Sequence, residues 1–417
     1  FVNEMFKHIT KWSARVERIE DIPEVMAKAF HIARSGRPGP VHVELPRETD
    51  ESEYILQKEK VVLPAYRRIP TVVHQPQATD VARFAQQLKN AKSPVIAAGK
   101  GVIRQGALGE LIALAEKLQA PVINAQDAIG VIAESHPLFA GYFKTGRSHP
   151  VCAEAMKTAD LVIGIGLRAG TAEMTELNSV TNAPQILIGF DDVQESRYRG
   201  DNQRVADPKL FLGALLAELG DFRKPADVSL ANRLAKVKAE TRAKLAALND
   251  ANRGNKPIYP GLVMEAMNNV LDDRAVVASD VGLCQMWARM YRNIATPESF
   301  MQSGVWNAMS FALPTAIVAK LEYPQRDVVA LAGDGAFLMT IGDLPTAAEY
   351  GANILMVVHN NSTFGQTYMQ QTNIYGHTFG TTFKSPNFAQ YAEASGCKGI
   401  RVSDAKDLPD AMRAAQA

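Results

Sequence analysis

Short apolar runs alternate with amphipathic helical patterns along most of the chain. Residues 94–98, PVIAA, form an apolar run that leads into a glycine turn, and residues 107–119, ALGELIALAEKLQ, follow with apolar positions at helical spacing. Further apolar runs between turns occur at 120–125, 159–166 and 184–190. Strands that alternate with helices predict a parallel sheet with helices on both faces. We therefore expect an α/β fold.

The same patterns divide the chain into several α/β parts. We expect the end of an incomplete domain over 1–50, a linker over 51–78, a central domain over 79–230, a linker helix over 231–256 and a third domain over 257–417. The opening residue Phe1 and the helical pattern at the C-terminus suggest that both ends of the sequence are incomplete. The length of 417 residues also predicts more than one domain.

Individual elements can be placed in the first and third parts. A helix is expected over 21–35 with Asp21 as its N-cap, followed by a strand in VHVEL. In the third part the apolar runs predict strands at 275–280, 327–334, 353–360 and 398–403, and a helix after the second of them. These elements place the polar motifs discussed below at strand ends.

Composition excludes several classes of function. The 417 residues carry a net charge of +1, which gives no basic surface for a nucleic acid. No apolar stretch reaches the length of a membrane span. The three cysteines are far apart, which offers no cysteine-based metal cluster and fits a reducing, cytoplasmic compartment. We expect a small-molecule enzyme or binding protein with no membrane or nucleic-acid partner.

The stretch 330–338, ALAGDGAFL, places a carboxylate between two glycines at the end of an apolar run. The triplet alone is also good turn chemistry. However, Asn361 follows 27 residues later, after a helix and the next predicted strand. Because parallel strands end at one edge of a sheet, Asp334 and Asn361 are expected to meet there. Carboxylate and amide oxygens are hard ligands that suit Mg²⁺ or Ca²⁺ better than zinc.

The surroundings of Asp334 also suit a diphosphate. Gly335 would let backbone N–H groups approach the anion, and the following helix N-terminus would direct its dipole at the negative charge. A single carboxylate leaves Mg²⁺ free to recruit phosphate oxygens. The chain has no Gly-Lys-Ser/Thr P-loop, so a nucleotide hydrolase is not expected. The motif predicts an anchor for a metal–diphosphate.

With these motifs in order, the chain resembles the acetolactate synthase branch of the thiamine-diphosphate-dependent enzymes. The resemblance covers nearly the whole chain. It is carried by the segments 19–46, 94–102, 159–168, 282–291 and 303–316, and by the Gly-Asp-Gly and Asn-Asn pair. It implies a thiamine-diphosphate-binding fold with a Rossmann-like central domain. It also implies a carboligase or lyase that decarboxylates a pyruvate-like 2-keto acid and transfers the acyl group to an acceptor carbonyl.

The resemblance assigns roles to particular residues. It implies that Asp334, Asn361 and the backbone carbonyl of Thr363 bind Mg²⁺. Met309 would be the apolar residue that holds thiamine diphosphate in a bent shape, which sets its imino nitrogen beside the reactive carbon. The other cofactor-binding positions implied are Gly282, Gln285, Asn307, Gly335, Ala336 and Gly365.

The family also places a catalytic glutamate in its first domain, and this position would lie upstream of Phe1. In the family the site forms between the first domain of one subunit and the third domain of another. The resemblance therefore implies a homodimer or homotetramer. It leaves open a non-catalytic reading, in which the chain is a cofactor-binding fragment.

The sequence departs from the branch at several positions. Leu283 and Cys284 stand where typical acetolactate synthases have glutamine and histidine, and Tyr368 stands near the place of a tryptophan. These differences keep another 2-keto acid decarboxylase or carboligase as an alternative. Arg168 matches a position near FAD, but it also reads as a strand-end arginine paired with a carboxylate, so FAD stays open. Whether His359, just before the asparagine pair, reaches the site is likewise open.

Overall fold

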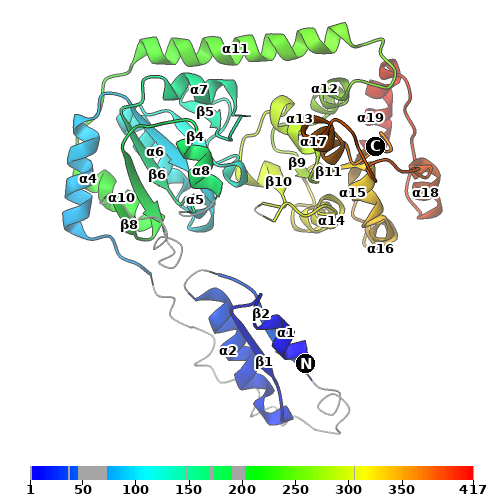
Figure 1. The fold of residues 1–417 in the computed structure, drawn as a ribbon, viewed down its shortest axis with the longest axis horizontal. Coiled ribbons are helices and arrows are strands. Elements are labelled where there is room, and N and C mark those ends of the chain that lie inside the picture. The colour runs from blue at the N-terminus through cyan, green and yellow to red at the C-terminus, as the bar shows by residue number, and fades with distance from the viewer. Residues whose placement is uncertain are drawn as a thin grey trace.

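The computed structural model describes residues 2–35, 38–45, 73–146, 148–168, 172–189, 202–304 and 306–416. These residues form an N-terminal unit, a central unit and a C-terminal unit, each built on its own parallel sheet (Figure 1). The expected α/β class is confirmed. In the described ranges no helix has the length and apolar character needed to cross a membrane.

The N-terminal unit is a small α/β layer. It contains α1 (Val2–Phe6), β1 (Trp12–Arg15), α2 (Ile22–Arg34) and β2 (Val41–Glu44), and its two strands are parallel. The helix expected over 21–35 is α2, but Asp21 makes no capping hydrogen bond with its side chain. Asp21 instead has helical backbone angles because it closes a short 3₁₀ turn, Ile19–Asp21. Most of the linker expected over 51–78 lies outside the described residues.

The central unit is a six-stranded parallel sheet in the order β5-β4-β3-β6-β7-β8. Its strands are β3 (Pro94–Ala98), β4 (Val122–Asn124), β5 (Phe139–Tyr142), β6 (Leu161–Ile165), β7 (Gln185–Gly189) and β8 (Gln203–Val205). Its helices are α4 (Ala78–Asn90), α5 (Lys100–Arg104), α6 (Leu108–Leu118), α7 (Pro150–Met156), α8 (Ala172–Asn178) and α10 (Pro208–Leu219). The apolar runs of the sequence are thus the strands of this sheet.

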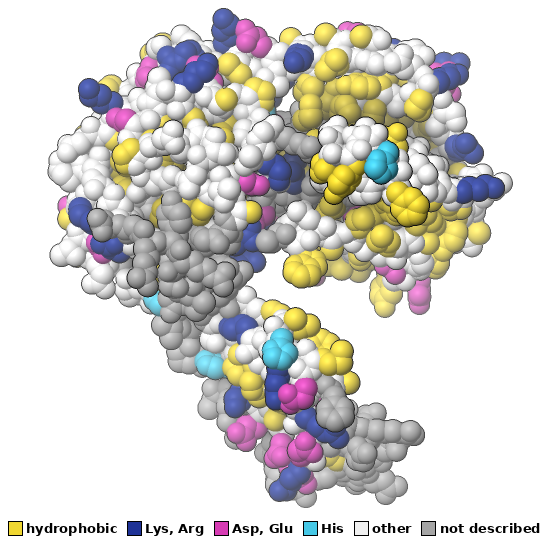
Figure 2. Space-filling view, viewed as in Figure 1, with side chains coloured by type: hydrophobic (Ala, Val, Ile, Leu, Met, Phe, Trp, Pro, Cys, Tyr) yellow, Lys and Arg dark blue, Asp and Glu magenta, His cyan; other side chains and the backbone are white. Residues whose placement is uncertain are grey.

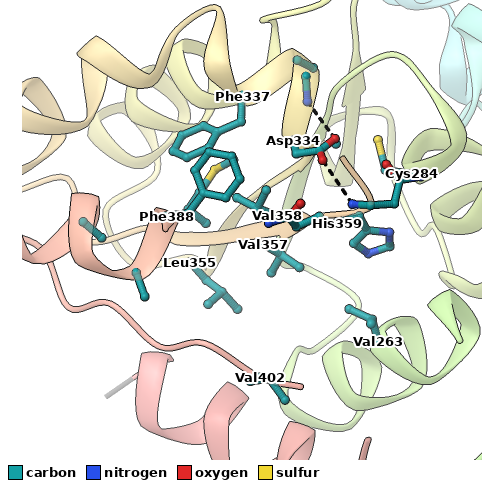
Figure 3. A pocket seen from close by; sticks show the side chains of 18 of the residues that line it. Val263, Cys284, Asp334, Phe337, Leu355, Val357, Val358, His359, Phe388 and Val402 are labelled. Atoms are coloured by element: carbon teal, nitrogen blue, oxygen red, sulfur yellow. Dashed lines mark hydrogen bonds between the residues drawn. The ribbon is translucent and has the colours of Figure 1, made fainter. Parts of the chain in front are cut away.

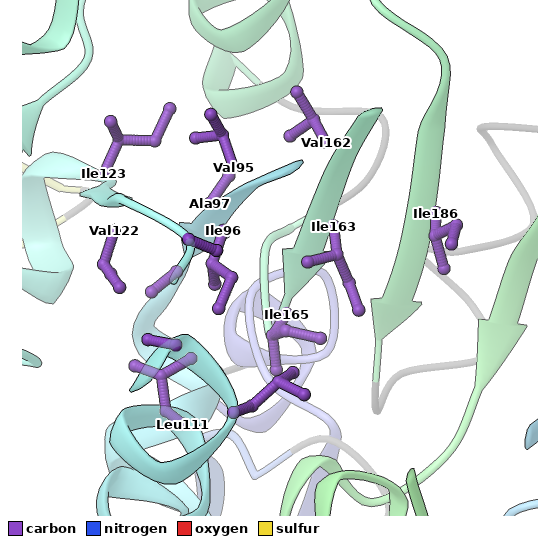
Figure 4. Packing of buried hydrophobic residues seen from close by; sticks show 14 of the residues in the cluster. Val95, Ile96, Ala97, Leu111, Val122, Ile123, Val162, Ile163, Ile165 and Ile186 are labelled. Carbon is purple, nitrogen blue, oxygen red and sulfur yellow. The ribbon is translucent and has the colours of Figure 1, made fainter. Parts of the chain in front are cut away.

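Every residue of β3 and β6 is buried, as expected for central strands covered by helices on both faces. Figure 4 shows Ile96, Ile163 and Ile165 packed together, with Leu111 of α6 against them. Burial of such side chains contributes roughly 1.5–3 kcal/mol each, so this core stabilises the unit.

The long helix α11 (Val228–Ala251) runs from the central unit to the C-terminal unit along the top of Figure 1. The ammonium of Lys238 donates to the carbonyl of His136 in the central unit at 3.0 Å. At its other end, the hydroxyl of Tyr291 donates to the side-chain oxygen of Asn249 at 3.0 Å. The expected linker helix therefore contacts both units it joins.

The C-terminal unit has a four-stranded parallel sheet in the order β10-β9-β11-β12. Its strands are β9 (Val276–Ser279), β10 (Phe300–Gln302), β11 (Val328–Gly333) and β12 (Leu355–His359). Its helices are α12 (Pro260–Val270), α13 (Leu283–Tyr291), α14 (Ala312–Glu322), α15 (Asp334–Leu338), α16 (Leu344–Glu349), α17 (Gly365–Tyr375), α18 (Phe388–Ala394) and α19 (Leu408–Gln416).

Two expectations for this unit are wrong in detail. No strand forms over 398–403, and the short strand β10 is present instead. The charged residues Lys398 and Arg401 interrupt that apolar run, and Ile400 remains 40% exposed, so little apolar surface favours a strand there. The helix after the Gly-Asp-Gly triplet is also broken into α15, a 3₁₀ turn (Ile341–Asp343) and α16.

Candidate functional site

The carboxylate of Asp334 is buried at the carboxyl end of β11, with only 1% of the residue exposed. Its Oδ1 accepts a hydrogen bond from the backbone N–H of Gly335 at 2.8 Å. Its Oδ2 accepts from the backbone N–H of Asn361 and from the hydroxyl of Ser385, each at 3.1 Å. The N–H of Ser362 also donates to Oδ2. Several donors to one ionised carboxylate fix the orientation of that side chain.

Strand pairing explains why Asp334 and Asn361 meet. β11 and β12 are parallel neighbours, and Gly333 lies opposite His359 in their register. Asp334 and Asn361 follow these paired residues at the same edge of the sheet, where open α/β sheets bind ligands. The juxtaposition expected from the sequence is therefore present. The binding of an ion by these residues stays a prediction.

The loop after β12 presents oxygen atoms next to Asp334. Ser362 has a φ of +53°, which is the left-handed region and turns the chain sharply. The side-chain oxygen of Asn361 accepts from the N–H of Thr363 at 3.1 Å, and the hydroxyl of Thr363 donates back to the carbonyl of Asn361 at 3.1 Å. Asn361 is exposed on the cavity side. Carboxylate, amide and carbonyl oxygens are hard donors.

Two glycines beside these residues allow close packing. A Cβ atom on Gly335 would lie 2.4 Å from the ring of Phe364, and one on Gly365 would lie 2.8 Å from Leu283. No larger residue fits at either position without displacing these neighbouring side chains. Packing against Phe364 and Leu283 therefore requires glycine at these two positions.

A cavity of about 1260 Å³ opens over this edge of the sheet (Figure 3). Nearly all the residues predicted for the site line it. They are Gly282, Asn307, Met309, Asp334, Gly335, Ala336, Asn361, Thr363 and Gly365. Gln285 is the exception: it is 6% exposed on α13 and is not among the lining residues. Its Nε2 is buried without a hydrogen-bond partner among the described residues.

The start of α13 forms another wall of the cavity. Gly282 precedes the helix with a φ of +138°, a conformation open to glycine alone. The thiol of Cys284 is 3% exposed, donates to the carbonyl of Asp280 at 3.5 Å, and has its pKa raised to about 12 by burial. A thiol with so high a pKa is not a nucleophile.

Asp280 is a residue that the sequence analysis missed. It lies at the end of β9, is 1% exposed, and accepts hydrogen bonds from the backbone N–H groups of Val281 at 2.9 Å and Ala312 at 3.3 Å. Burial raises its pKa, while the N–H donors oppose that shift. It ties the segment that carries Met309 to the sheet. The sequence signal for Asp280 was that the apolar run 275–278 is followed by a serine and an aspartate.

His359 closes β12 next to the asparagine pair. It lines the cavity, and its Nε2 is buried with no hydrogen-bond partner in the described residues. Desolvation lowers its pKa to about 4, so the imidazole is neutral at physiological pH. The structure thus places this side chain in the site, which the sequence had left open.

Comparisons with known proteins agree with this geometry. The family model of the thiamine pyrophosphate enzyme C-terminal TPP-binding domain matches residues 280–417, and that of the thiamine pyrophosphate enzyme central domain matches residues 81–215. A probable acetolactate synthase large subunit from Methanococcus aeolicus is 31% identical over 99% of this chain and 70% of its own length. The acetolactate synthase of Mycobacterium leprae is 31% identical over 98% of this chain and 66% of its own length.

The chain belongs to the thiamine pyrophosphate enzyme family. Within that family it is similar to acetolactate synthase large subunits over almost all of its length. The expected thiamine-diphosphate-dependent decarboxylation and carboligation of the acetolactate synthase type is thereby confirmed at the level of the family. The matched C-terminal domain contains the whole Asp334–Asn361 site.

In this family member the residue expected near FAD is paired inside the chain. The backbone N–H and the Nε of Arg168 each donate to the carboxylate of Glu173 at 2.8 Å, and its guanidinium lies 3.2 Å from Asp127. Burial raises the pKa of Glu173 to about 7, with the Asp127 carboxylate adding to the effect and Arg168 opposing it. The strand-end pairing considered from the sequence is thus present, and FAD binding stays a prediction.

A cluster of three or more histidine, cysteine, aspartate or glutamate side chains suited to a metal does not occur in the described part of the chain. The predicted magnesium ligands comprise one carboxylate, one amide oxygen and one backbone carbonyl, so a cluster of that kind is not required. Such a set suits an ion that also takes ligands from a bound diphosphate.

Proposed function

We propose that the protein binds thiamine diphosphate through Mg²⁺ held by Asp334, Asn361 and the backbone carbonyl of Thr363. The observation that carries this proposal is the 3.1 Å hydrogen bond from the N–H of Asn361 to the carboxylate of Asp334. It sets two hard donor groups from different strand ends beside one another. One carboxylate balances half of the charge of the ion and leaves the other half for diphosphate oxygens.

The residues around this pair fit the cofactor. Gly335 and Gly365 line the cavity beside this pair, and a backbone that carries no side chain lets a diphosphate approach its N–H groups closely. Met309 and Asn307 line the same cavity, in a segment where Asn307 has a φ of +49°. Met309 would support the bent cofactor, and Asn307 would lie beside its pyrimidine ring. The Nε2 of Gln285, on the adjoining helix α13, has no hydrogen-bond partner among the described residues.

The proposed reaction is the decarboxylation of a pyruvate-like 2-keto acid with transfer of the acyl group to an acceptor carbonyl. Thiamine diphosphate, when bound, supplies the carbon nucleophile and the electron sink for this chemistry. The chain's own residues hold the cofactor, bend it and shield it from water. The apolar side chains of the cavity wall, such as Met309 and Phe337, favour a step in which charge is lost.

We also propose that the protein works as a homodimer or homotetramer. Helix α17, which follows the asparagine pair, has no buried residue, and apolar side chains gather on the C-terminal unit in Figure 2. The most exposed of them near the site are Trp306, Ile374, Tyr375 and Phe379, each at least 66% exposed. Exposed apolar surface of this kind marks an interaction site.

A cytoplasmic location completes the proposal, and whether FAD is also bound is a question for experiment. Cys152, Cys284 and Cys397 are free thiols, which suits a reducing compartment. An absorbance spectrum of the purified protein tests for FAD directly. Bound flavin would give absorbance maxima near those of free flavin. Size-exclusion chromatography with light scattering tests the assembly.

Cofactor binding and product analysis test the central proposal. Thiamine diphosphate is expected to quench tryptophan fluorescence in the presence of Mg²⁺ and not after chelation with EDTA, because Trp287 lines the cavity. Incubation with pyruvate is expected to give acetolactate when the glutamate that the family places in its first domain is present. Acetaldehyde instead would favour a simple decarboxylase, which the Leu283 and Cys284 differences also suggest. Binding without product would favour a non-catalytic role, and failure to bind would refute the proposal.

A further inference from the structure

His359 occupies a position where an apolar side chain would be expected. It shares a face of β12 with Leu355 and Val357, because alternate residues of a strand point to the same side. Those two residues pack in the apolar cluster that also holds Cys284, with Val263 and Trp287 against it. A histidine is therefore the polar exception on an apolar face.

The imidazole points into the cavity. Figure 3 shows His359 with Val263 of α12 and Cys284 of α13 on the facing elements, and all three line the cavity. Valine has no polar atom to offer, and the thiol of Cys284 donates instead to the carbonyl of Asp280. The Nε2 atom has no hydrogen-bond partner among the described residues. A buried polar atom without a partner destabilises the folded protein, so its retention needs a reason.

The position of His359 along the strand supplies that reason. It lies opposite Gly333 in the β11–β12 register, and Gly333 immediately precedes Asp334, while Asn361 follows His359 by two residues. Its side chain is thus at the level where the proposed metal–diphosphate sits. Ligand sites are commonly apolar walls with a few polar atoms that fix the orientation of the ligand.

We propose that Nε2 of His359 hydrogen-bonds the anchored end of the cofactor, directly or through one ordered water, and so positions the diphosphate. The inference rests on the proposed function, because it assumes that this cavity holds thiamine diphosphate. His359 acts as a positioning residue, and no change in the charge of its imidazole is needed. The bound ligand supplies the partner that Nε2 lacks among the described residues.

Two substitutions separate this role from simple packing. His359→Leu removes the polar atom and fills the wall with an apolar side chain, whereas His359→Gln keeps an N–H donor near the position of Nε2. We expect His359→Leu to raise the Kd for thiamine diphosphate at least about tenfold at saturating Mg²⁺, and His359→Gln to stay within about threefold of the parent protein. Titration of the intrinsic fluorescence gives the Kd without any assay of turnover.

The stability of the cofactor-free protein gives a second readout. His359→Leu is expected to keep or raise the melting temperature, because it removes a buried polar group that lacks a partner. Weaker cofactor binding with unchanged or higher stability is a combination that a merely structural histidine would not produce. Met301→Leu, on the edge strand β10, serves as the matched control and should leave the Kd unchanged, because Met301 packs against the sheet and is not among the residues that line the cavity.

Each outcome decides the question. An unchanged Kd in His359→Leu overturns the inference, as does an equal loss in His359→Gln or in Met301→Leu. If His359→Leu fails to fold, the result with His359→Gln decides: a Kd within about threefold of the parent value supports the role, and a larger loss refutes it. A parent protein that does not bind thiamine diphosphate refutes the proposed function, and the inference falls with it.

Discussion

The carboxylate of Asp334 accepts a hydrogen bond at 3.1 Å from the backbone N–H of Asn361, a residue 27 positions further along the chain. The contact joins the carboxyl ends of two neighbouring parallel strands. It leaves the amide side chain of Asn361 on the cavity wall, where an ion could take its oxygen. The consequence for cofactor binding can be tested by removing that amide alone.

Asn361→Ala is expected to weaken Mg²⁺-dependent binding of thiamine diphosphate by about tenfold or more, because the ion loses a ligand. The fold should survive, since Asn361 is exposed and its backbone contact with Asp334 remains. Fluorescence titration at several Mg²⁺ concentrations measures the effect. Asn269→Ala, exposed on α12 and not among the residues that line the cavity, is the control and should bind normally. Equal affinity in both variants would remove Asn361 from the proposed ligand set.

Gly282→Ala is expected to destabilise the C-terminal unit by about 1–3 kcal/mol, because alanine does not adopt a φ of +138° without strain. A Cβ at this position would meet nothing within 4 Å, so the cost is conformational. Gly333→Ala is the matched control: its Cβ also meets nothing, and its φ is an ordinary −78°. Urea unfolding of the cofactor-free protein, followed by tryptophan fluorescence, compares the two. Equal stability would contradict the strained backbone at Gly282.

Arg168→Ala is expected to destabilise the central unit by about 3–5 kcal/mol, because it leaves two buried carboxylates without their cation. The side chains of Asp127 and Glu173 are only 10% and 6% exposed. Scanning calorimetry measures the change. The exposed pair of Lys236 and Glu240 supplies a control, since Lys236→Ala should cost about 0.5 kcal/mol or less. A loss as small as the control's would mean that Arg168 is not needed to neutralise the pair.

The contribution of His149 to the stability of the central unit is expected to fall as the pH drops from about 6.5 to about 4. Burial lowers the pKa of His149 to about 4, while the unfolded chain has the ordinary value of 6.5. Between these values the unfolded state binds more protons, so acid favours unfolding, with a slope of up to about 1.4 kcal/mol per pH unit. Above pH 6.5 this contribution is fully present and constant.

The variant His149→Asn tests the source of this pH dependence. The Nδ1 of His149 accepts from the N–H of Val151 and caps α7, a role that asparagine can fill. The variant should therefore keep the helix, although the smaller side chain lowers stability overall. The difference in stability between the parent and the variant should shrink as the pH drops from 6.5 to 4, because only the parent carries the His149 contribution. Calorimetry at a series of pH values provides the comparison. An unaltered slope would assign the acid sensitivity to other groups.

The strands that position the site were predictable from the sequence, because apolar runs between turns report burial directly. The strands at the edges of the sheets were less predictable from the sequence. Residues 398–403 looked like a strand, yet charged side chains leave that run without enough apolar surface. Gln285 was expected at the cofactor and is buried in α13, since one residue of register decides which way a helical side chain points.

The sequence by itself determined the α/β class, the family and the identity of the residues at the strand ends, because hydrophobic periodicity and short polar motifs are local properties. Only the tertiary structure decided which distant groups share one site. Ser385 reaches Asp334 from 51 residues away, and His359, whose buried Nε2 has no partner among the described residues, lines the cavity. Such contacts depend on how helices and loops pack on the sheet, and that packing is set by the whole core rather than by any segment of the chain.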